Sequence, residues 1–310
     1  MYRYNLIKIF KALADEMRLR IARVLLRGTF NVNEVFFIVG GKQSNISHHL
    51  KVLQDCNLII GKKEGLQVFY RINDIEENKL ILDLIKKEEE NIDFYDDDLA
   101  RFEAILQKRK KIADEYFNNV GEEFETVQSE LFGKIYSTED AIRLFGTNLD
   151  TIVDIGCGTG INLPILSKYA KKVVGFDSSA KMIRLSEHIC QKYKLNYDLK
   201  MGDINKLPFI DESVDGVFVN MVLHHISNPS GVFNEFQRIL TKNGKILFID
   251  LLSHDDESFR EKYADLWLGF SFTEINEWFT KNNFTINEEI IKTDKENPNL
   301  KVIIILAQKN

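Results

Sequence analysis

The 310-residue chain has 44% hydrophobic residues and a formal net charge of −6, a composition that is typical of a globular protein. No apolar run approaches the roughly 18–20 residues that span a bilayer, and no apolar segment with a cleavage site stands at the N-terminus. The three cysteines are scattered and form no CxC or CxxC pair, which favours a reducing compartment. We therefore expect a cytoplasmic protein with no membrane partner.

The charge is distributed unevenly along the chain. Residues 1–74 carry 12 Lys/Arg against 6 Asp/Glu, residues 75–150 carry 10 against 20, and residues 151–310 carry 19 against 21. A basic head on an acidic chain indicates a polyanionic partner for the head, although a solvated basic face would give the same count. We expect a DNA-binding domain at 1–75, an acidic helical linker that dimerises or caps at 76–145, and a second domain at 146–310.

The basic head has the element order of a winged helix-turn-helix. Apolar residues at helical spacing end at Gly28, a short helix is stopped by Gly40-Gly41, and a basic hairpin surrounds residues 61–65. In the helix between them, Ile46, Leu50 and Leu53 form an inward face. The expected elements are helices at 10–26, 32–39 and 43–55, followed by strands at 58–60 and 68–71.

Three phrases of the head resemble the ArsR/SmtB family of bacterial repressors: KALAD from Lys11, QSNISHHLKVL from Gln43, and Phe69-Tyr70-Arg71. The resemblance covers about residues 5–75. It implies a homodimer whose helices at 43–55 enter successive major grooves of a double-stranded DNA operator. The hairpin residues Lys62, Lys63 and Arg71 would then contact phosphates or the minor groove.

The outward face of the helix at 43–55 carries short polar or basic side chains that can hydrogen-bond base edges and phosphates. Ser44, Asn45, Ser47 and His48 are the expected base-proximal residues, and an ordinary exposed polar face is the alternative. The full set on this face is Gln43, Ser44, Asn45, Ser47, His48 and Lys51.

Metal sensing, which many ArsR/SmtB proteins perform, is not expected for this chain. The segment comparable to the CxC site, residues 31–35, has no cysteine, and no histidine falls in residues 72–187. Thiophilic and borderline metals need Cys or His clusters. We therefore predict no metal site, and we expect any regulatory signal to come from the second domain.

That second domain opens with a glycine turn between a strand and a helix. An apolar strand at 152–153 leads into Asp154, and Gly156, Gly158 and Gly160 follow in G-x-G-x-G spacing. Glycines allow a tight turn close to a ligand, and a helix beginning at Ile161 would point N–H groups at a carboxylate. Asp154 can meet an ammonium group. An ordinary βα turn is the alternative explanation.

The next strands repeat the pattern of an acid at the carboxyl end. A strand at 173–177 ends in Asp177, which can accept hydrogen bonds from both ribose hydroxyls. A strand at 197–201 ends at Gly202-Asp203, and a fourth at 216–220 leads into His224-His225. This ordered set, over residues 149–310, resembles class I S-adenosylmethionine methyltransferases.

The resemblance implies a Rossmann-like α/β domain with a seven-stranded, mostly parallel sheet. It also implies S-adenosylmethionine as cofactor and S-adenosylhomocysteine as product, with an acid facing the adenine amino group and Ile204 packed on the ring. The expected cofactor-binding residues are Asp154, Gly156, Gly158, Gly160, Asp177, Ser178, Asp203, Ile204 and Asn220.

The sequence says more about which methyl acceptors are disfavoured than about which one is used. DNA methylation is disfavoured, because Asn220-Met221-Val222 stands where amino-methylating enzymes carry [DN]PP[YF], and no Pro-Cys nucleophile is present. The LHHI phrase from Leu223 looks like that of small-molecule methyltransferases. His224, His225 and His254 are the candidate bases, since the pKa of histidine lies near neutrality. Alternatively, His224-His225 packs at the strand end.

The stretch between the domains is read as helical from Leu99 onward. Its acidic runs at 88–90 and 96–98 are expected to be a solvated loop, and Tyr116, Phe117 and Phe124 either close over the cofactor or pack in the core. The sequence thus predicts an ArsR-like transcriptional regulator whose second domain methylates a small molecule. The alternative is a non-catalytic repressor that senses S-adenosylmethionine or S-adenosylhomocysteine.

Overall fold

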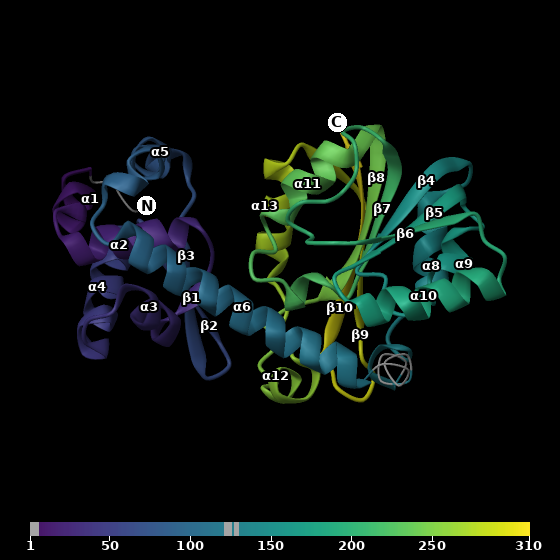
Figure 1. The fold of residues 1–310 in the computed structure, drawn as a ribbon, viewed down its shortest axis with the longest axis horizontal. Coiled ribbons are helices and arrows are strands. Elements are labelled where there is room, and N and C mark those ends of the chain that lie inside the picture. Colours follow the sequence, from purple (N-terminus) through teal and green to yellow (C-terminus); the bar gives the residue numbers. More distant parts are fainter. Residues whose placement is uncertain (1–5, 121–125, 127–129) are drawn as a thin grey trace. The chain divides into compact units, whose positions relative to one another are not determined.

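A computed structural model describes residues 6–120, 126 and 130–310 (Figure 1). Contacts within the chain divide it into two compact units, the first ending at Lys111 and the second beginning at Ile112. None of the helices in the described ranges combines the length and apolar character needed to cross a membrane. Each unit has its own hydrophobic core and is described by itself.

The first unit is a winged helix-turn-helix, as the sequence predicts. Its three-stranded sheet has the order β1-β3-β2, with antiparallel pairing throughout. Ile46, Leu50 and Leu53 of the fourth helix are fully buried, which confirms the inward face inferred from their spacing. Its elements are α1 (Leu6–Leu13), α2 (Glu16–Leu26), β1 (Phe30–Asn31), α3 (Val32–Val39), α4 (Gln43–Asp55), β2 (Ile59–Glu64), β3 (Gln67–Ile72), α5 (Lys79–Lys87) and the first part of α6 (Tyr95–Val120).

Two element boundaries differ from the sequence expectation. The single helix expected at 10–26 is two helices, because Asp15 caps α2 by accepting the Arg18 N–H at 3.0 Å. The hairpin strands are also longer than expected, so that β2 reaches Glu64 and only Gly65-Leu66 form the turn. Local capping and pairing therefore override the hydrophobic pattern at both places.

The acidic run at 96–98 is not a solvated loop. It lies in the first turn of α6, and Asp98 is only 2% exposed. Its carboxylate accepts hydrogen bonds from Arg20 at 2.9 and 2.7 Å and from Arg23 at 2.7 Å, and both arginines are buried in α2. A buried ion-pair cluster therefore fastens α6 to the winged helix, together with Arg109, which pairs with Glu34 at 2.7 Å.

The second unit is a seven-stranded sheet with helices around it, which confirms the Rossmann-like expectation (Figure 1). Strand order is β6-β5-β4-β7-β8-β10-β9; β4 to β8 pair in parallel, and β10 is antiparallel to both of its neighbours. The strands are β4 (Leu149–Ile155), β5 (Ala170–Asp177), β6 (Tyr197–Met201), β7 (Val214–Asn220), β8 (Leu240–Leu251), β9 (Phe284–Thr293) and β10 (Lys301–Lys309).

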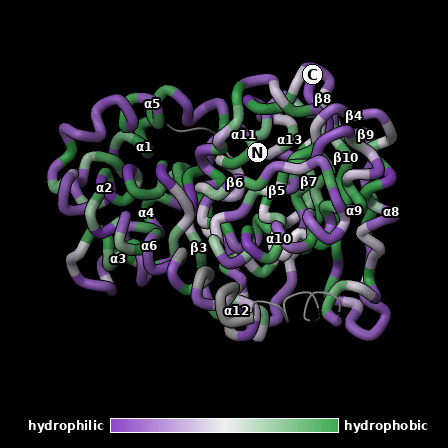
Figure 2. The backbone as a smooth tube through the Cα atoms, turned by 45° about the vertical axis from the view of Figure 1, so that its right-hand side comes forward, coloured by the Kyte–Doolittle hydropathy of each residue, from purple (hydrophilic) through white to green (hydrophobic). Residues whose placement is uncertain are grey.

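The central strands are nearly continuous apolar runs, as expected for a parallel sheet covered on both faces. In Figure 2 much of the tube of these strands is coloured hydrophobic, whereas many of the connecting loops are coloured hydrophilic. Ser271 and Glu274 form a capping box at the start of α13. The helices of this unit are α8 (Thr138–Ile142), α9 (Leu163–Leu166), α10 (Ala180–Lys192), α11 (Val232–Ile239), α12 (Ser258–Tyr263) and α13 (Phe272–Lys281).

Strand β4 lies between β5 and β7, so the chain leaves it on one side and returns on the other. In an open α/β sheet, such a switch point leaves a crevice at the carboxyl ends of the strands, where ligands bind. The glycine turn after β4, Asp177 at the end of β5 and Asn220 at the end of β7 all lie at this edge. The topology therefore brings the predicted cofactor residues together.

Candidate functional site

The turn after β4 requires glycine at two of its positions. Gly156 has φ +69° and Gly160 has φ +83°, a backbone region that other residues rarely adopt. A Cβ at Gly156 would lie 2.5 Å from Cγ2 of Val222, and a Cβ at Gly160 would lie 2.9 Å from the Cα of Ser186. The turn is therefore packed against both the loop after β7 and helix α10.

The helix that follows the turn differs from the expectation. It begins at Leu163 rather than at Ile161, and α9 has only four residues. A helix this short contributes little dipole. Within the turn, the N–H groups of Gly156, Cys157, Gly158 and Gly160 already donate to acceptors of the protein itself.

Asp177 is held in place by the backbone around it. One carboxylate oxygen accepts the Gly158 N–H at 2.9 Å, and the other accepts the Ser179 N–H at 2.8 Å. Each oxygen has further acceptor capacity. The backbone thus fixes both oxygens of Asp177 at the carboxyl end of β5, where the sequence predicts the ribose contact.

Asp154 is a buried carboxyl group with an unmet acceptor. It is 1% exposed, and its Oδ2 has no hydrogen-bond partner among the described residues. Burial raises its pKa well above the usual value, and the negative charge of Asp177 raises it further. An ammonium group on a bound ligand would supply the missing partner, which fits the amino-acid end of S-adenosylmethionine.

Three further predicted cofactor residues are Asp203, Ile204 and Asn220. Asp203 is exposed, and its Oδ1 accepts the Asn205 N–H at 2.9 Å, while the next residue, Ile204, is 8% exposed. Asn220 accepts a hydrogen bond from the Tyr136 hydroxyl at 2.7 Å, and burial raises the pKa of that hydroxyl.

Ser178 is exposed, whereas its neighbour Ser179 is buried and caps α10 by accepting the Met182 N–H. The sequence reasoning missed Ser179, although a serine just before a helical run is a recognisable capping signal.

A histidine–carboxylate cluster follows β7 at the same sheet edge. Nδ1 of His224 lies 2.6 Å from Oδ1 of Asp250, the penultimate residue of β8. The Asp250 carboxylate also accepts the N–H groups of Leu223 at 2.9 Å and Leu251 at 2.8 Å. The His224 ring is therefore fixed in orientation by a carboxylate that the backbone itself immobilises.

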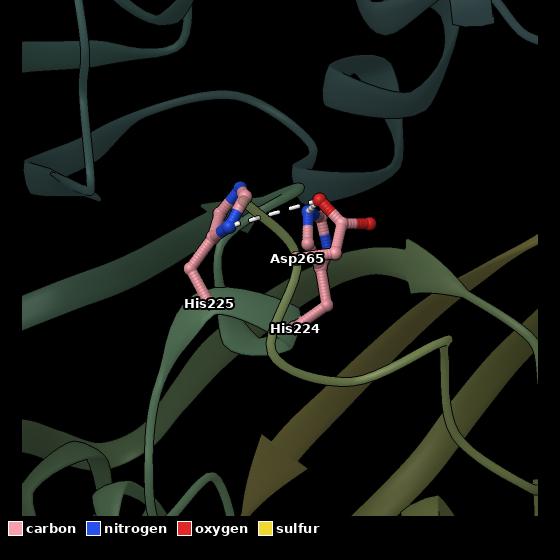
Figure 3. A group of neighbouring side chains, drawn as sticks. All are labelled: His224, His225 and Asp265. Carbon is pink, nitrogen blue, oxygen red and sulfur yellow. Dashed lines mark ion pairs between the residues drawn. The ribbon is translucent and has the colours of Figure 1, made fainter. Parts of the chain in front are cut away.

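Asp265, which sequence reasoning did not single out, completes the cluster. Its Oδ1 lies 3.8 Å from both Nε2 of His224 and Nδ1 of His225 (Figure 3). Asp265 comes from the loop after α12, far along the chain and outside any motif, so no local signal could have identified it. The His225 Nδ1 also lies 3.3 Å from the carbonyl oxygen of Ala264.

The cluster shifts the pKa of each of its members. Burial lowers the pKa of His224, but the charges of Asp250 and Asp265 outweigh it and raise that pKa to about 9. Burial, and then the charge of His224, hold the pKa of His225 well below its usual value. Burial raises the pKa of Asp265 to about 7, with His224 opposing the shift.

His254 is not one of the three clustered residues, but the charge of His224 affects its pKa. Its Nε2 is buried without a hydrogen-bond partner within the part of the chain that the structure describes, and its Nδ1 accepts the Asp256 N–H at 3.3 Å. Burial lowers its pKa, and the charge of His224 contributes in the same direction.

Of the aromatics expected over the cofactor, Tyr116 in α6 is half-buried, and burial with the charge of Asp265 raises its pKa to about 12. Phe124 and the side chain of Phe117 fall outside the described residues.

In the first unit, the predicted DNA-facing side chains of α4 are exposed. Gln43 also donates to Asn33 Oδ1 at 2.6 Å, which ties the start of α4 to α3. In the hairpin, Lys63 is exposed, and Arg71 is half-buried. Lys62 pairs with the buried Glu64 at 2.8 Å, a partner that the sequence reasoning did not anticipate.

The fold comprises a winged helix-turn-helix and a Rossmann-like α/β domain. Residues 15–60 match the model of the bacterial regulatory protein arsR family, and residues 153–248 match the methyltransferase domain. The chain thus joins an ArsR-family helix-turn-helix domain to a methyltransferase domain.

Curated methyltransferases match part of the chain. A demethylmenaquinone methyltransferase of Thermotoga maritima is 27% identical over 53% of this chain and 73% of its own length. A malonyl-[acyl-carrier protein] O-methyltransferase of Legionella pneumophila is 28% identical over 56% of this chain and 58% of its own length. The uncharacterized methyltransferase YcgJ of Bacillus subtilis is 27% identical over 34% of this chain. The chain spans only 42% of YcgJ, so two of these three proteins are matched over less than two thirds of their length.

Solved structures agree on the fold. A geranyl diphosphate methyltransferase in complex with geranyl diphosphate and sinefungin has a TM-score of 0.54 at 13% identity, covering 65% of this chain and 99% of that one. A chain from the complex of the Haloferax volcanii Trm112 activator with a methyltransferase has a TM-score of 0.53 at 18% identity, covering 63% and 97%. The matched methyltransferase domain supports S-adenosylmethionine as the cofactor.

Proposed function

We propose that the protein is a DNA-binding transcriptional regulator whose second domain methylates a small molecule. One contact carries the enzymatic part of this proposal. Val222, two residues before His224, packs against Gly156 so closely that a Cβ at Gly156 would lie 2.5 Å from its Cγ2. The cofactor turn and the cluster are therefore adjacent at one sheet edge, as methyl transfer requires of donor and acceptor.

S-adenosylmethionine supplies an activated methyl group to a nucleophile on the acceptor. The chain itself would bind the nucleoside through Asp177, meet the ammonium group with Asp154, and place the acceptor beside the cluster of His224, His225 and Asp265. A nucleophile that carries a proton needs a group to handle it, and the cluster provides nitrogen and carboxylate atoms there. We therefore propose an acceptor with an acidic hydroxyl or enol.

Activity would be tested with S-adenosylmethionine carrying a labelled methyl group and a panel of phenols, enols and quinols. Appearance of S-adenosylhomocysteine together with a labelled product would support the enzyme. His225→Gln should lower kcat far more than it weakens cofactor binding, because the proposal places the acceptor beside the cluster and the nucleoside at Asp177. An equal loss of cofactor binding in this variant would contradict that division of roles.

The regulatory part rests on α4, whose polar face is exposed in a helix-turn-helix of the arsR family. The test is a DNA titration on the region upstream of the protein's own gene at fixed salt, because phosphate contacts make affinity salt-dependent. It would be run without ligand, with S-adenosylmethionine and with S-adenosylhomocysteine. A sequence-specific complex is expected. If the protein binds this DNA only weakly and without sequence preference, the regulatory proposal is wrong.

A second candidate, a sensor without catalysis, is favoured by helix α6. Asp98 near the start of this helix is bonded to Arg20 and Arg23 of the first unit, and the last part of the helix, from Ile112, belongs to the second unit. If cofactor state alters DNA affinity, DNA must alter cofactor affinity by the same factor. A ligand-dependent shift in the titration, without turnover of any acceptor, would favour the sensor.

A further inference from the structure

We propose that His224, His225 and Asp265 form a binding site for one divalent transition-metal ion. Each residue offers one ligand atom, and the three atoms lie within 4.8 Å of one another. Figure 3 shows the three side chains converging from the loop after β7 and the loop after α12. The ArsR-type sites that the sequence lacks are metal sensors in the DNA-binding half, so this proposal concerns a different place in the chain.

The separations suit an ion better than they suit hydrogen bonds. Oδ1 of Asp265 lies 3.8 Å from both His224 Nε2 and His225 Nδ1, too far for a hydrogen bond. The centre of a triangle with 3.8 Å edges is roughly 2.2 Å from each corner, close to the about 2.0–2.2 Å of zinc–nitrogen and zinc–oxygen bonds. The third separation, between the two histidine nitrogens, is at most 4.8 Å. These nitrogens therefore need to move only slightly closer together to bind one ion.

The surroundings of His224 match the outer shell of known metal sites. A histidine ligand commonly donates its other ring N–H to a carboxylate, which fixes the tautomer and orients the ring. Here Asp250 lies 2.6 Å from Nδ1 of His224, which leaves Nε2 directed at Asp265. Asp250 is itself fully buried and is held by two backbone N–H groups.

The third ligand is also held in place before any ion arrives. The N–H groups of Leu266 and Trp267, which follow Asp265, both donate to the carbonyl oxygen of His224 at 3.0 Å. The indole N–H of Trp267 donates to Ile226 at 2.7 Å. Oδ2 of Asp265 is buried and has no hydrogen-bond partner within the described part of the chain. A cation beside Asp265 would satisfy a carboxylate that the fold otherwise leaves partly unpaired.

Two imidazole nitrogens and one carboxylate oxygen suit Zn²⁺, Fe²⁺, Co²⁺ or Mn²⁺ rather than Ca²⁺ or a thiophilic ion. Three protein ligands with an open position are typical of catalytic rather than structural sites. If the proposed methyltransferase function holds, the open position would take an acceptor oxygen and lower the pKa of its hydroxyl, with the proton released to water. The metal binding itself does not depend on that function.

The test uses the full-length protein, stripped with chelator, dialysed and titrated with ZnSO₄ or CoCl₂ by calorimetry. We expect about one equivalent of ion per chain, with visible Co²⁺ absorption bands that report nitrogen and oxygen ligands. His225→Gln and Asp265→Asn each remove one ligand while nearly preserving the size of the side chain. Each should abolish stoichiometric binding of the ion. Asp250→Asn should weaken binding by about 10–100-fold, as loss of an outer-shell partner does.

His188→Gln is the matched control, since His188 is exposed on α10 and should leave the ion stoichiometry unchanged. Circular dichroism would check folding of each variant. If the ligand variants unfold, histidine ¹⁵N chemical shifts of the wild type with and without Zn²⁺ decide the question, because His224 and His225 should move together. Absence of a stoichiometric site in the wild type, or equal binding in all variants, would overturn the proposal. Because ion stoichiometry is measured without S-adenosylmethionine or acceptor, failure of methyl transfer would leave it standing.

Discussion

The carboxylate of Asp177 accepts the backbone N–H of Gly158 at 2.9 Å, which ties the end of β5 to the glycine turn after β4. The same carboxylate accepts the Ser179 N–H at the start of α10. One side chain thus links the two segments that would enclose the ribose and the amino-acid end of the cofactor. Its position depends on parallel pairing of β4 with β5, which sets Ile155 beside Phe176.

Asp177→Asn should weaken S-adenosylmethionine binding by at least about tenfold, because hydrogen bonds to a charged group contribute about 1.5–3 kcal/mol. Isothermal titration calorimetry would measure the change. Asp198→Asn is the matched control, since Asp198 is a half-buried carboxylate on the neighbouring strand β6 whose side chain is 40% exposed. Wild-type affinity in Asp177→Asn would remove this residue from the cofactor site.

Binding of S-adenosylmethionine should release a proton from Asp154. The pKa of this carboxyl is raised by burial and by Asp177, whereas an adjacent ammonium group favours the charged carboxylate. The ligand therefore lowers the pKa on binding, and its affinity should increase as the pH rises toward the raised pKa of the free protein. Calorimetry in buffers of different ionisation enthalpy would measure the proton released.

Asp154→Asn should abolish that proton release and remove the rise in affinity with pH. The variant keeps the size of the side chain, and it loses only the charge that would meet the ammonium. Proton release that persists unchanged in Asp154→Asn would assign it to another group.

The sequence predicted the order of elements well, because glycines, acids at strand ends and helical periodicity are local signals. The sequence did not predict contacts between segments that lie far apart along the chain. The DDD run at 96–98 looks like a solvated loop, yet Asp98 is buried between two arginines of α2. Asp265 likewise has no motif around it, and only folding of the chain brings it close to His224. The break at Asp15 could have been found, since an aspartate before a helical run is a capping signal.

Asp98→Ala should destabilise the first unit by about 3–5 kcal/mol, because removing one partner of a buried ion pair leaves uncompensated charge. Here two buried guanidinium groups, those of Arg20 and Arg23, would lose their carboxylate. Chemical denaturation followed by a probe in the winged helix would measure the loss. Asp97→Ala, one position earlier in the same helix turn and exposed, should change stability by less than about 0.5 kcal/mol. Equal effects of the two substitutions would contradict the ion-pair assignment.

Lys63 and Lys62 should contribute unequally to DNA binding, although they are neighbours in β2. Lys63 is exposed, whereas the ammonium of Lys62 lies 2.8 Å from the buried carboxylate of Glu64. If Lys63 neutralises one phosphate, Lys63→Ala should reduce the slope of log affinity against log salt by about 0.9. Lys62→Ala should change the slope less, because its charge is already partly compensated.

The salt titrations would be made on the same operator fragment with both variants and with Lys206→Ala, an exposed lysine of the methyltransferase domain that should leave the slope unchanged. A slope that falls equally for Lys62→Ala and Lys63→Ala would mean that DNA draws Lys62 away from Glu64. That exchange would separate the buried carboxylate of Glu64 from the ammonium of Lys62, so it should also appear as a lower affinity than the lost phosphate contact alone explains.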